Sequence, residues 1–166
     1  MRILILSIAA AASLAACAHS TQTASAPVTQ TTPPPAAHPS GPVPGSVEDF
    51  RVTVGDRVFF AYDQYALSPE ARSVLERQAA WLRHYPQVQV LLAGNCDERG
   101  TREYNLALGA RRAAAAKDYL VSLGIATNRV QTVSYGKERP LDPRSNEEAW
   151  SVNRNAHTQI VSGAVS

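Results

Sequence analysis

From Val47 onward, apolar residues fall into short alternating runs and into longer runs with helical spacing. Alternation is typical of half-buried strands, whereas apolar residues three and four positions apart are typical of amphipathic helices. The pattern predicts strands over residues 56–62, 87–93, 129–135 and 156–162, helices over residues 68–85 and 101–123, and one or two helical turns over residues 147–153.

Residues with strong positional preferences set the ends of these helices. Ser68-Pro69-Glu70 places an N-cap, a proline in the first turn and an acidic residue at one helix start, and Pro86 ends that helix. Gly124 fits the position just after the second helix. The order is β-α-β-α-β-(α)-β. It predicts an α+β fold with helices packed on one face of a mixed four-stranded sheet.

The chain begins with a segment typical of secreted proteins. Arg2 precedes a run of Ile, Leu and Ala that is too short to span a bilayer, which takes about 20 apolar residues. Leu14-Ala15-Ala16-Cys17 resembles a bacterial lipobox. We therefore expect a signal peptide over residues 1–16 and a lipidated Cys17; an ordinary signal peptide followed by a chance cysteine is the alternative.

Residues 18–46 have the composition of a linker. They contain no Asp, Glu, Lys or Arg and hold seven of the eleven prolines. Such a segment cannot bury enough apolar surface to form a core. We therefore assign residues 17–46 to a lipidated tether and residues 47–166 to one folded domain.

The overall charge and the reactive residues exclude several classes of function. A formal net charge of +2, with acidic residues near most arginines, argues against nucleic-acid binding. Cys96 and the four histidines form no catalytic or metal-binding motif, so no metal or other cofactor is expected. We interpret Cys96 as structural, and Arg99, Arg102 and Glu103 as a solvated face.

One group of residues predicts a binding pocket. Asn105 and Arg112 are seven positions apart, about two helical turns, and Leu108 lies between them on the same face. Asp97 precedes this helix. Together they indicate a pocket with one carboxylate and one guanidinium near a helix N-terminus, suited to a zwitterionic end group. A salt bridge between Asp97 and Arg112 is the alternative.

Several segments resemble the OmpA-like peptidoglycan-binding domain. Residues 94–101 and 103–113 carry the family pattern of Asn105, Leu108, Arg112 and Ala113, with Gly109 where serine is usual. Residues 60–67 and 134–140 are further family segments. The resemblance covers about residues 47–162.

The resemblance implies a non-enzymatic protein that binds meso-diaminopimelate in the peptidoglycan stem peptide. Asp97 would hold the ammonium and Arg112 the carboxylate, with a further contact near Asp63. Lipoprotein members of the family sit in the outer membrane, to which Ala18 after the lipidated cysteine also points. Their partners are TolB and the Tol inner-membrane proteins, which act in cell division.

Two departures from the family pattern concern the expected pocket. Ala61 stands where an aspartate is usual, and Asn155 where a second arginine is usual. The loss of that arginine removes a cation that the family pattern places near the pocket. Two hypotheses compete with wall binding. In the first, the chain is a partner protein of the Tol system with an inert pocket; in the second, it is an enzyme acting on the cell wall.

Overall fold

A computed structural model describes residues 41–166. The expected signal peptide, Cys17 and most of the expected tether lie outside these residues. The elements in chain order are α1 (Val47–Asp49), the π-helix η1 (Phe50–Val54), β1 (Arg57–Phe59), α2 (Pro69–His84), β2 (Gln89–Asn95), α3 (Arg102–Ser122), the 3-10 helix η2 (Thr127–Arg129), β3 (Val130–Gly136), α4 (Glu147–Asn153) and β4 (Asn155–Ser162).

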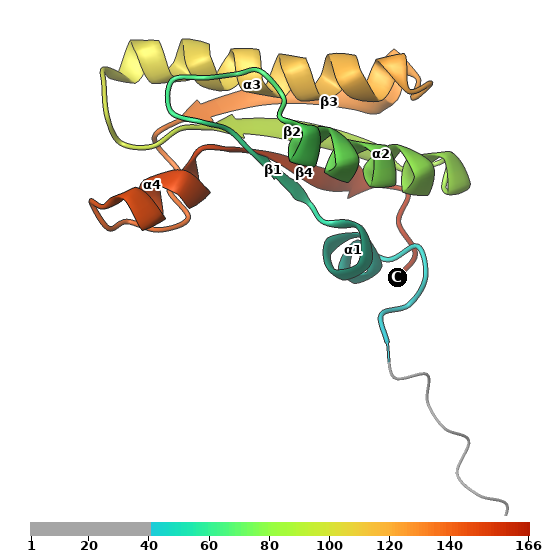
Figure 1. Cartoon of the computed structure of the whole chain (residues 1–166). Coiled ribbons are helices and arrows are strands. Elements are labelled where there is room, and N and C mark those ends of the chain that lie inside the picture. Colours follow the sequence, from blue (N-terminus) through green and yellow to red (C-terminus); the bar gives the residue numbers. More distant parts are fainter. Residues whose placement is uncertain (1–40) are drawn as a thin grey trace, which may run out of the picture. The chain divides into compact units, whose positions relative to one another are not determined.

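The four strands form one mixed sheet, which confirms the predicted fold class. The strand order is β1-β4-β2-β3 (Figure 1). β2 and β3 run parallel, whereas β4 is antiparallel to both β1 and β2. β4 and β2 are therefore the central strands, and β1 and β3 form the two edges.

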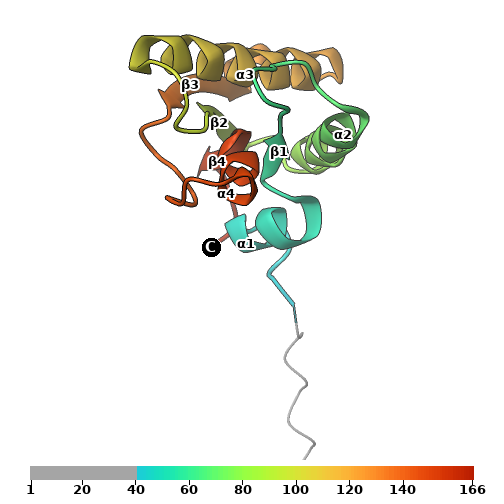
Figure 2. The ribbon, with the colours of Figure 1, turned by 60° about the vertical axis from the view of Figure 1, so that its left-hand side comes forward.

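The two long helices, α2 and α3, cover one face of this sheet (Figures 1 and 2). The hydrophobic core lies between these helices and the sheet. Leu75 and Leu82 of α2 and Leu92 of β2 are at most 1% exposed. Full burial of each such side chain stabilises the fold by about 1.5–3 kcal/mol. Ala113 of α3 is also fully buried, and its small side chain lets the helix approach the sheet closely.

Two glycines set the distance between α3 and the sheet. A Cβ atom added to Gly94 of β2 would lie 1.8 Å from the carbonyl oxygen of Gly109 in α3. One added to Gly109 would lie 2.4 Å from Ser134 Oγ. The backbones therefore touch at this point, and the glycine that replaces the usual serine at position 109 leaves room for Ser134.

The predicted helix ends are confirmed. The Ser68 hydroxyl accepts a hydrogen bond from the Ala71 amide, and Pro69 occupies the first turn of α2. Thr101 caps α3 by accepting from the Tyr104 amide. Gly124 follows α3 with a φ of 91°, in the left-handed region that favours glycine.

The start of the domain differs from the prediction in two ways. The strand predicted over residues 56–62 is only Arg57–Phe59. Beyond it the Phe60 amide still donates to the Arg154 carbonyl, and the chain then turns, with Gln64 N–H donating to the Ala61 carbonyl. The helical turns of residues 47–54 were not predicted.

Those turns escape a search for the α-helical period because they include a π-helix, in which each N–H donates five residues back. The Gly55 amide donates to the Phe50 carbonyl in this way. Phe50 and Val54 are buried by the winding. β2 and β3 also begin and end one or two residues later than predicted.

The segment before α1 joins the C-terminal end of the chain. Ser46 forms a parallel bridge with Val165, and the Val165 amide donates to the Gly45 carbonyl at 3.0 Å. The Asp49 carboxylate accepts from Gly45 N–H at 2.9 Å and from Trp81 Nε1 at 2.8 Å. Residues just before Val47 are thus fixed to the folded unit.

Candidate functional site

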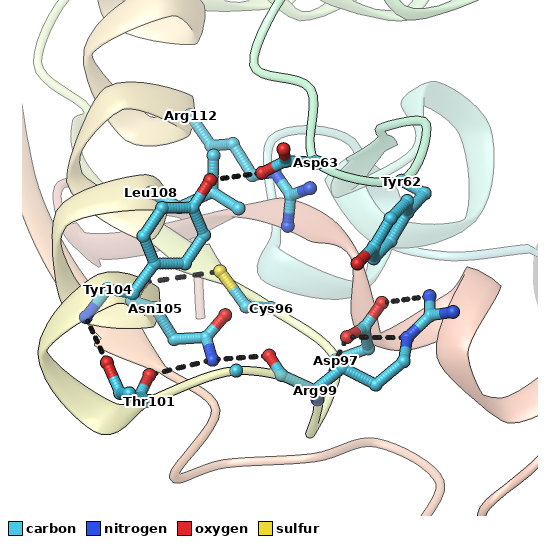
Figure 3. A pocket seen from close by; sticks show the side chains of 11 residues that line it. Tyr62, Asp63, Cys96, Asp97, Arg99, Thr101, Tyr104, Asn105, Leu108 and Arg112 are labelled. Atoms are coloured by element: carbon cyan, nitrogen blue, oxygen red, sulfur yellow. Dashed lines mark hydrogen bonds and ion pairs between the residues drawn. The ribbon is translucent and has the colours of Figure 1, made fainter.

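A cavity of about 410 Å³ opens where β2 leads into α3, beside the loop after β1 (Figure 3). Its volume falls in the range of about 300–1,000 Å³ typical of ligand pockets. Its lining residues are Tyr62, Asp63, Cys96, Asp97, Arg99, Gly100, Thr101, Tyr104, Asn105, Leu108 and Arg112. All five residues predicted for the pocket, Asp63, Asp97, Asn105, Leu108 and Arg112, are among them.

Asn105 positions the loop that leads into α3. Its Nδ2 donates to the carbonyls of Arg99 at 2.8 Å and Thr101 at 3.0 Å. These carbonyls belong to the loop that carries Asp97, and Asn105 is 2% exposed. The predicted site residue Asn105 therefore shapes the cavity by holding its rim.

Arg112 is fully buried and its guanidinium is bound by backbone carbonyls. Nε donates to Gln64 O at 2.8 Å, Nη1 to Asn95 O at 2.8 Å and Nη2 to Ala61 O at 3.2 Å. No carboxylate of residues 41–166 forms an ion pair with it. Burial lowers the pKa of Arg112, but an arginine stays charged in proteins.

Asp97 pairs with arginines other than Arg112. Its carboxylate accepts from Arg99 Nη2 at 2.7 Å and from Arg154 Nη1 at 3.4 Å. Burial opposes the ionisation of Asp97, but hydrogen bonds and charge from Arg99 outweigh it, so the pKa of Asp97 is lowered. The alternative of an Asp97–Arg112 salt bridge is therefore wrong.

Arg99 is part of the site, which corrects its interpretation as a solvated residue. Its guanidinium lies between two aromatic rings, 4.2 Å from the centroid of Tyr62 and 4.1 Å from that of Trp150. The same guanidinium donates from Nε and Nη2 to the Asp97 carboxylate, and Figure 3 shows this contact beside the Tyr62 ring. Sequence reasoning missed this role because the partner rings lie far away along the chain.

Two tyrosines at the cavity rim were also missed. The Tyr104 hydroxyl donates to the Asp63 carboxylate, which raises the pKa of Tyr104. Asp63 adopts a φ of 58°, an uncommon conformation that points to a tight turn at this position. Tyr62 and Tyr104 remain 60% and 46% exposed, so both rings are available to a ligand.

The two departures from the family pattern lie outside the cavity lining. Asn155 is 1% exposed and its Oδ1 accepts from Asn95 Nδ2 at 3.0 Å. Ala61 contributes its carbonyl to Arg112. Neither residue lines the cavity, so its cations are Arg99 and Arg112, and the effect of Asn155 on the pocket stays a prediction.

Cys96 is a buried free thiol, as expected for a structural cysteine. Its Sγ donates to the Asn105 carbonyl at 3.3 Å, and burial raises its pKa. A thiol with a raised pKa is a weak nucleophile. Among residues 41–166, no group of His, Cys, Asp and Glu is arranged to hold a metal ion.

The fold and the cavity define a ligand-binding domain with charges of both signs in one pocket. The sequence pattern of the OmpA family matches residues 59–154, and the chain belongs to that family. Membership agrees with the prediction of a binding protein rather than an enzyme.

Two similar proteins align with 73% of this chain. The peptidoglycan-associated lipoprotein of Mesorhizobium japonicum is 54% identical over 121 residues, covering 73% of this chain and 71% of the relative. The protein of the same name from Rhizobium meliloti is also 54% identical, covering 73% and 68%.

Solved structures agree with the fold. The peptidoglycan-associated lipoprotein of Burkholderia pseudomallei superposes with a TM-score of 0.62 at 39% identity, covering 63% of this chain and 89% of that one. The C-terminal domain of Helicobacter pylori MotB gives 0.61 at 22% identity, covering 64% and 84%, and supports the fold alone. Among residues 41–166, no helix combines the length and hydropathy needed to cross a membrane.

Proposed function

We propose that the cavity binds the meso-diaminopimelate end group of the peptidoglycan stem peptide. The observation that carries the proposal is Arg112, a buried cation that faces a cavity and forms no ion pair with a carboxylate of residues 41–166. A buried charge is costly unless it is paired. A ligand carboxylate would supply the missing partner, and relatives named peptidoglycan-associated lipoprotein point to the same ligand class.

The two charges of the end group have separate partners in this proposal. The guanidinium of Arg112 has five N–H donors and makes three hydrogen bonds to carbonyls, so two remain for a carboxylate. The ligand ammonium binds the Asp97 carboxylate and displaces the hydrogen bonds that Arg99 donates to it. Arg99 is 30% exposed in its side chain and can yield this position while it stays stacked on aromatic rings.

The wider role follows from the family and the leading segment. Lipidation of Cys17 would fix the chain to the outer membrane, and binding of the end group would tie that membrane to the cell wall without a covalent bond. Such a protein would work with TolB and the Tol inner-membrane proteins during division. Residues 1–40 carry the anchor in this proposal, and residues 41–166 carry the wall contact.

Calorimetry with two muropeptides tests the pocket directly. Residues 39–166 contain the whole core and would be titrated with a muropeptide that carries meso-diaminopimelate and with one that carries lysine. Lysine lacks the distal carboxylate, so its muropeptide should bind at least about tenfold more weakly, since a hydrogen bond to a charged group contributes about 1.5–3 kcal/mol.

Equal affinity for the two muropeptides would refute the assignment of Arg112 to the carboxylate. Asp97→Asn should weaken both muropeptides alike, because both carry the ammonium. If neither binds, the pocket is inert, and capture of TolB by the same chain would then favour a role as a Tol partner alone.

A further inference from the structure

A second cavity lies on the sheet face that the long helices leave uncovered. Thr158 of β4 donates to Gln78 Oε1 of α2 at 2.8 Å, so Thr158 points toward the helices. Because side chains alternate along a strand, His157 and Gln159 point to the other face. There they line a cavity of about 130 Å³, together with Arg57, Asn95, Tyr135, Arg139, Leu141 and Asn155. No lining residue is shared with the first cavity.

Two arginines reach this cavity from opposite edges of the sheet. Arg57 belongs to edge strand β1, and Arg139 follows edge strand β3. The Arg139 guanidinium lies 3.7 Å from the centroid of the Tyr135 ring. None of the ion pairs among residues 41–166 includes Arg139, so its charge is not compensated by a nearby carboxylate.

Arg57 has a buried donor without an acceptor. Its Nη1 donates to Asp56 at 3.0 Å, and its Nη2 lies 3.3 Å from His157 Nδ1. Its Nε is buried and, in the part of the chain that the structure describes, is the one buried side-chain nitrogen or oxygen with no hydrogen-bond partner. A buried donor left unpaired costs about 1–3 kcal/mol, so an acceptor from outside the chain would stabilise this arrangement.

The other polar groups of the cavity leave it rich in donors. Gln159 Nε2 lies 3.2 Å from His157 Nδ1, and Asn95 Nδ2 donates a hydrogen bond to Asn155 Oδ1. Asp56 lies 3.1 Å from His157 Nε2 but does not line the cavity. No carboxylate lines it, and the uncompensated charge is positive.

From these contacts we infer that the second cavity binds a small oxyanion, a carboxylate or phosphate group, between Arg57 and Arg139. Planar guanidinium groups match the geometry of both anions. The volume of about 130 Å³ is well below the roughly 300 Å³ at which pockets for whole drug-sized ligands begin. The cavity therefore suits a single anionic group better than a complete drug-sized ligand.

His157 reports on this binding. Burial and the charge of Arg57 lower its pKa, whereas Asp56 acts in the opposite direction. An anion that bridges Arg57 and Arg139 would offset the positive charge of Arg57 beside the ring. Binding should therefore raise the pKa of His157, and it should do so in proportion to occupancy.

The test is an NMR titration of residues 39–166, which contain only two histidines, His84 and His157. Inorganic phosphate and acetate would be added in separate arms, with chloride at matched ionic strength as the control. We expect saturable shifts of the His157 ring signals and a higher pKa, while the exposed His84 stays unchanged. The anion that binds more tightly identifies the preferred group.

Two variants make the result specific. Arg139→Gln removes the uncompensated charge from an exposed side chain and should weaken anion binding about tenfold. Arg144→Gln is the matched control, because Arg144 is exposed in the same loop but pairs with Asp142. Shifts that do not saturate, equal shifts of both histidines, or equal affinity in wild type and Arg139→Gln would overturn the inference.

Discussion

Arg112 combines two properties that rarely occur together at one residue. It is fully buried in the middle of a helix, yet it forms no ion pair within residues 41–166 and is held by three backbone carbonyls. These bonds connect α3 to the end of β2 and to the loop after β1. The same guanidinium thus supports the fold and supplies a cation to the first cavity.

Replacing this arginine should show its contribution to stability. Arg112→Met keeps much of the aliphatic stem but removes the guanidinium, so the carbonyls of Gln64 and Asn95 lose this donor, whereas the Ala61 carbonyl still accepts from Gln64 N–H. We expect a loss of about 1–3 kcal/mol in the free energy of unfolding by urea, because the lost hydrogen bonds, above all the one to the buried Asn95 carbonyl, outweigh the gain from no longer burying a charge. Arg111→Met, at the exposed neighbouring position, is the matched control and should change stability little. A stabilised Arg112→Met would show that the charge is retained only for a ligand.

The lowered pKa of Asp97 predicts how the stability of the fold depends on pH. Because its pKa in the folded protein is below the ordinary value of 3.8, its charge stabilises the fold above that value, and this stabilisation is lost as the pH falls through the folded pKa. Urea unfolding of wild type and Asp97→Asn from neutral pH to about pH 2 should show a gap that closes below about pH 4. The exposed Asp118→Asn is the control. A gap that stays constant with pH would contradict the prediction.

Four of the five predicted site residues share one property, which is local spacing, whereas Asp63 was expected from the family resemblance alone. Asn105, Leu108 and Arg112 lie on one face of a helix, so the helical period alone brings them together. Asp97 precedes that helix and needs only a short loop to reach them. Arg99 was misassigned because its function depends on Tyr62 and Trp150, whose positions follow from tertiary packing and leave no periodic pattern in the sequence.

At the scale of elements, α3 depends on direct backbone contact with β2. Gly94 and Gly109 allow this contact, and α3 in turn carries Tyr104, Asn105, Leu108 and Arg112 to the cavity. The helix ends were predictable because caps and glycine are local signals. The strand order was not, since it depends on which strands pair at long range, and the short α1 and η1 have no helical period of their own.

A single methyl group should therefore disturb both fold and site. In Gly94→Ala the new Cβ would lie 1.8 Å from the Gly109 carbonyl, so α3 must move away from the sheet. Overpacking of this kind costs about 1–3 kcal/mol, and the free energy of unfolding measured with urea should fall by that amount. Affinity for the muropeptide should fall as well. Gly41→Ala, where a Cβ meets no atom within 4 Å, is the control. Unchanged stability in Gly94→Ala would show that α3 can move away from the sheet at little cost in free energy.

At the scale of the whole molecule, the cavity and the start of the folded unit lie at opposite ends of β4. Gly94, near the cavity, pairs with Ala156 at the beginning of β4, and Ser46 bridges Val165 beyond its end (Figure 1). The strand advances by roughly 20 Å from Ala156 to Ser162, and Val165 lies three residues further along the chain. In the proposed anchor, a load between the membrane and the wall would therefore run along the sheet.

This separation predicts that the residues before α1 affect stability but not ligand binding. A chain of residues 47–166 lacks the Gly45–Asp49 hydrogen bond, the Ser46 cap of α1 and the Ser46–Val165 bridge. Compared with residues 39–166, its free energy of unfolding should be lower by about 1–3 kcal/mol, or roughly 4–10 °C in Tm, because a hydrogen bond to the charged Asp49 is among those lost.

Calorimetric affinity for the meso-diaminopimelate muropeptide should stay within about twofold, since none of the removed residues lines the first cavity. Equal Tm values would show that the domain begins at Val47, as its composition suggests. A large loss of affinity at equal stability would instead place the start of the domain in the binding site and refute the independence of the two ends.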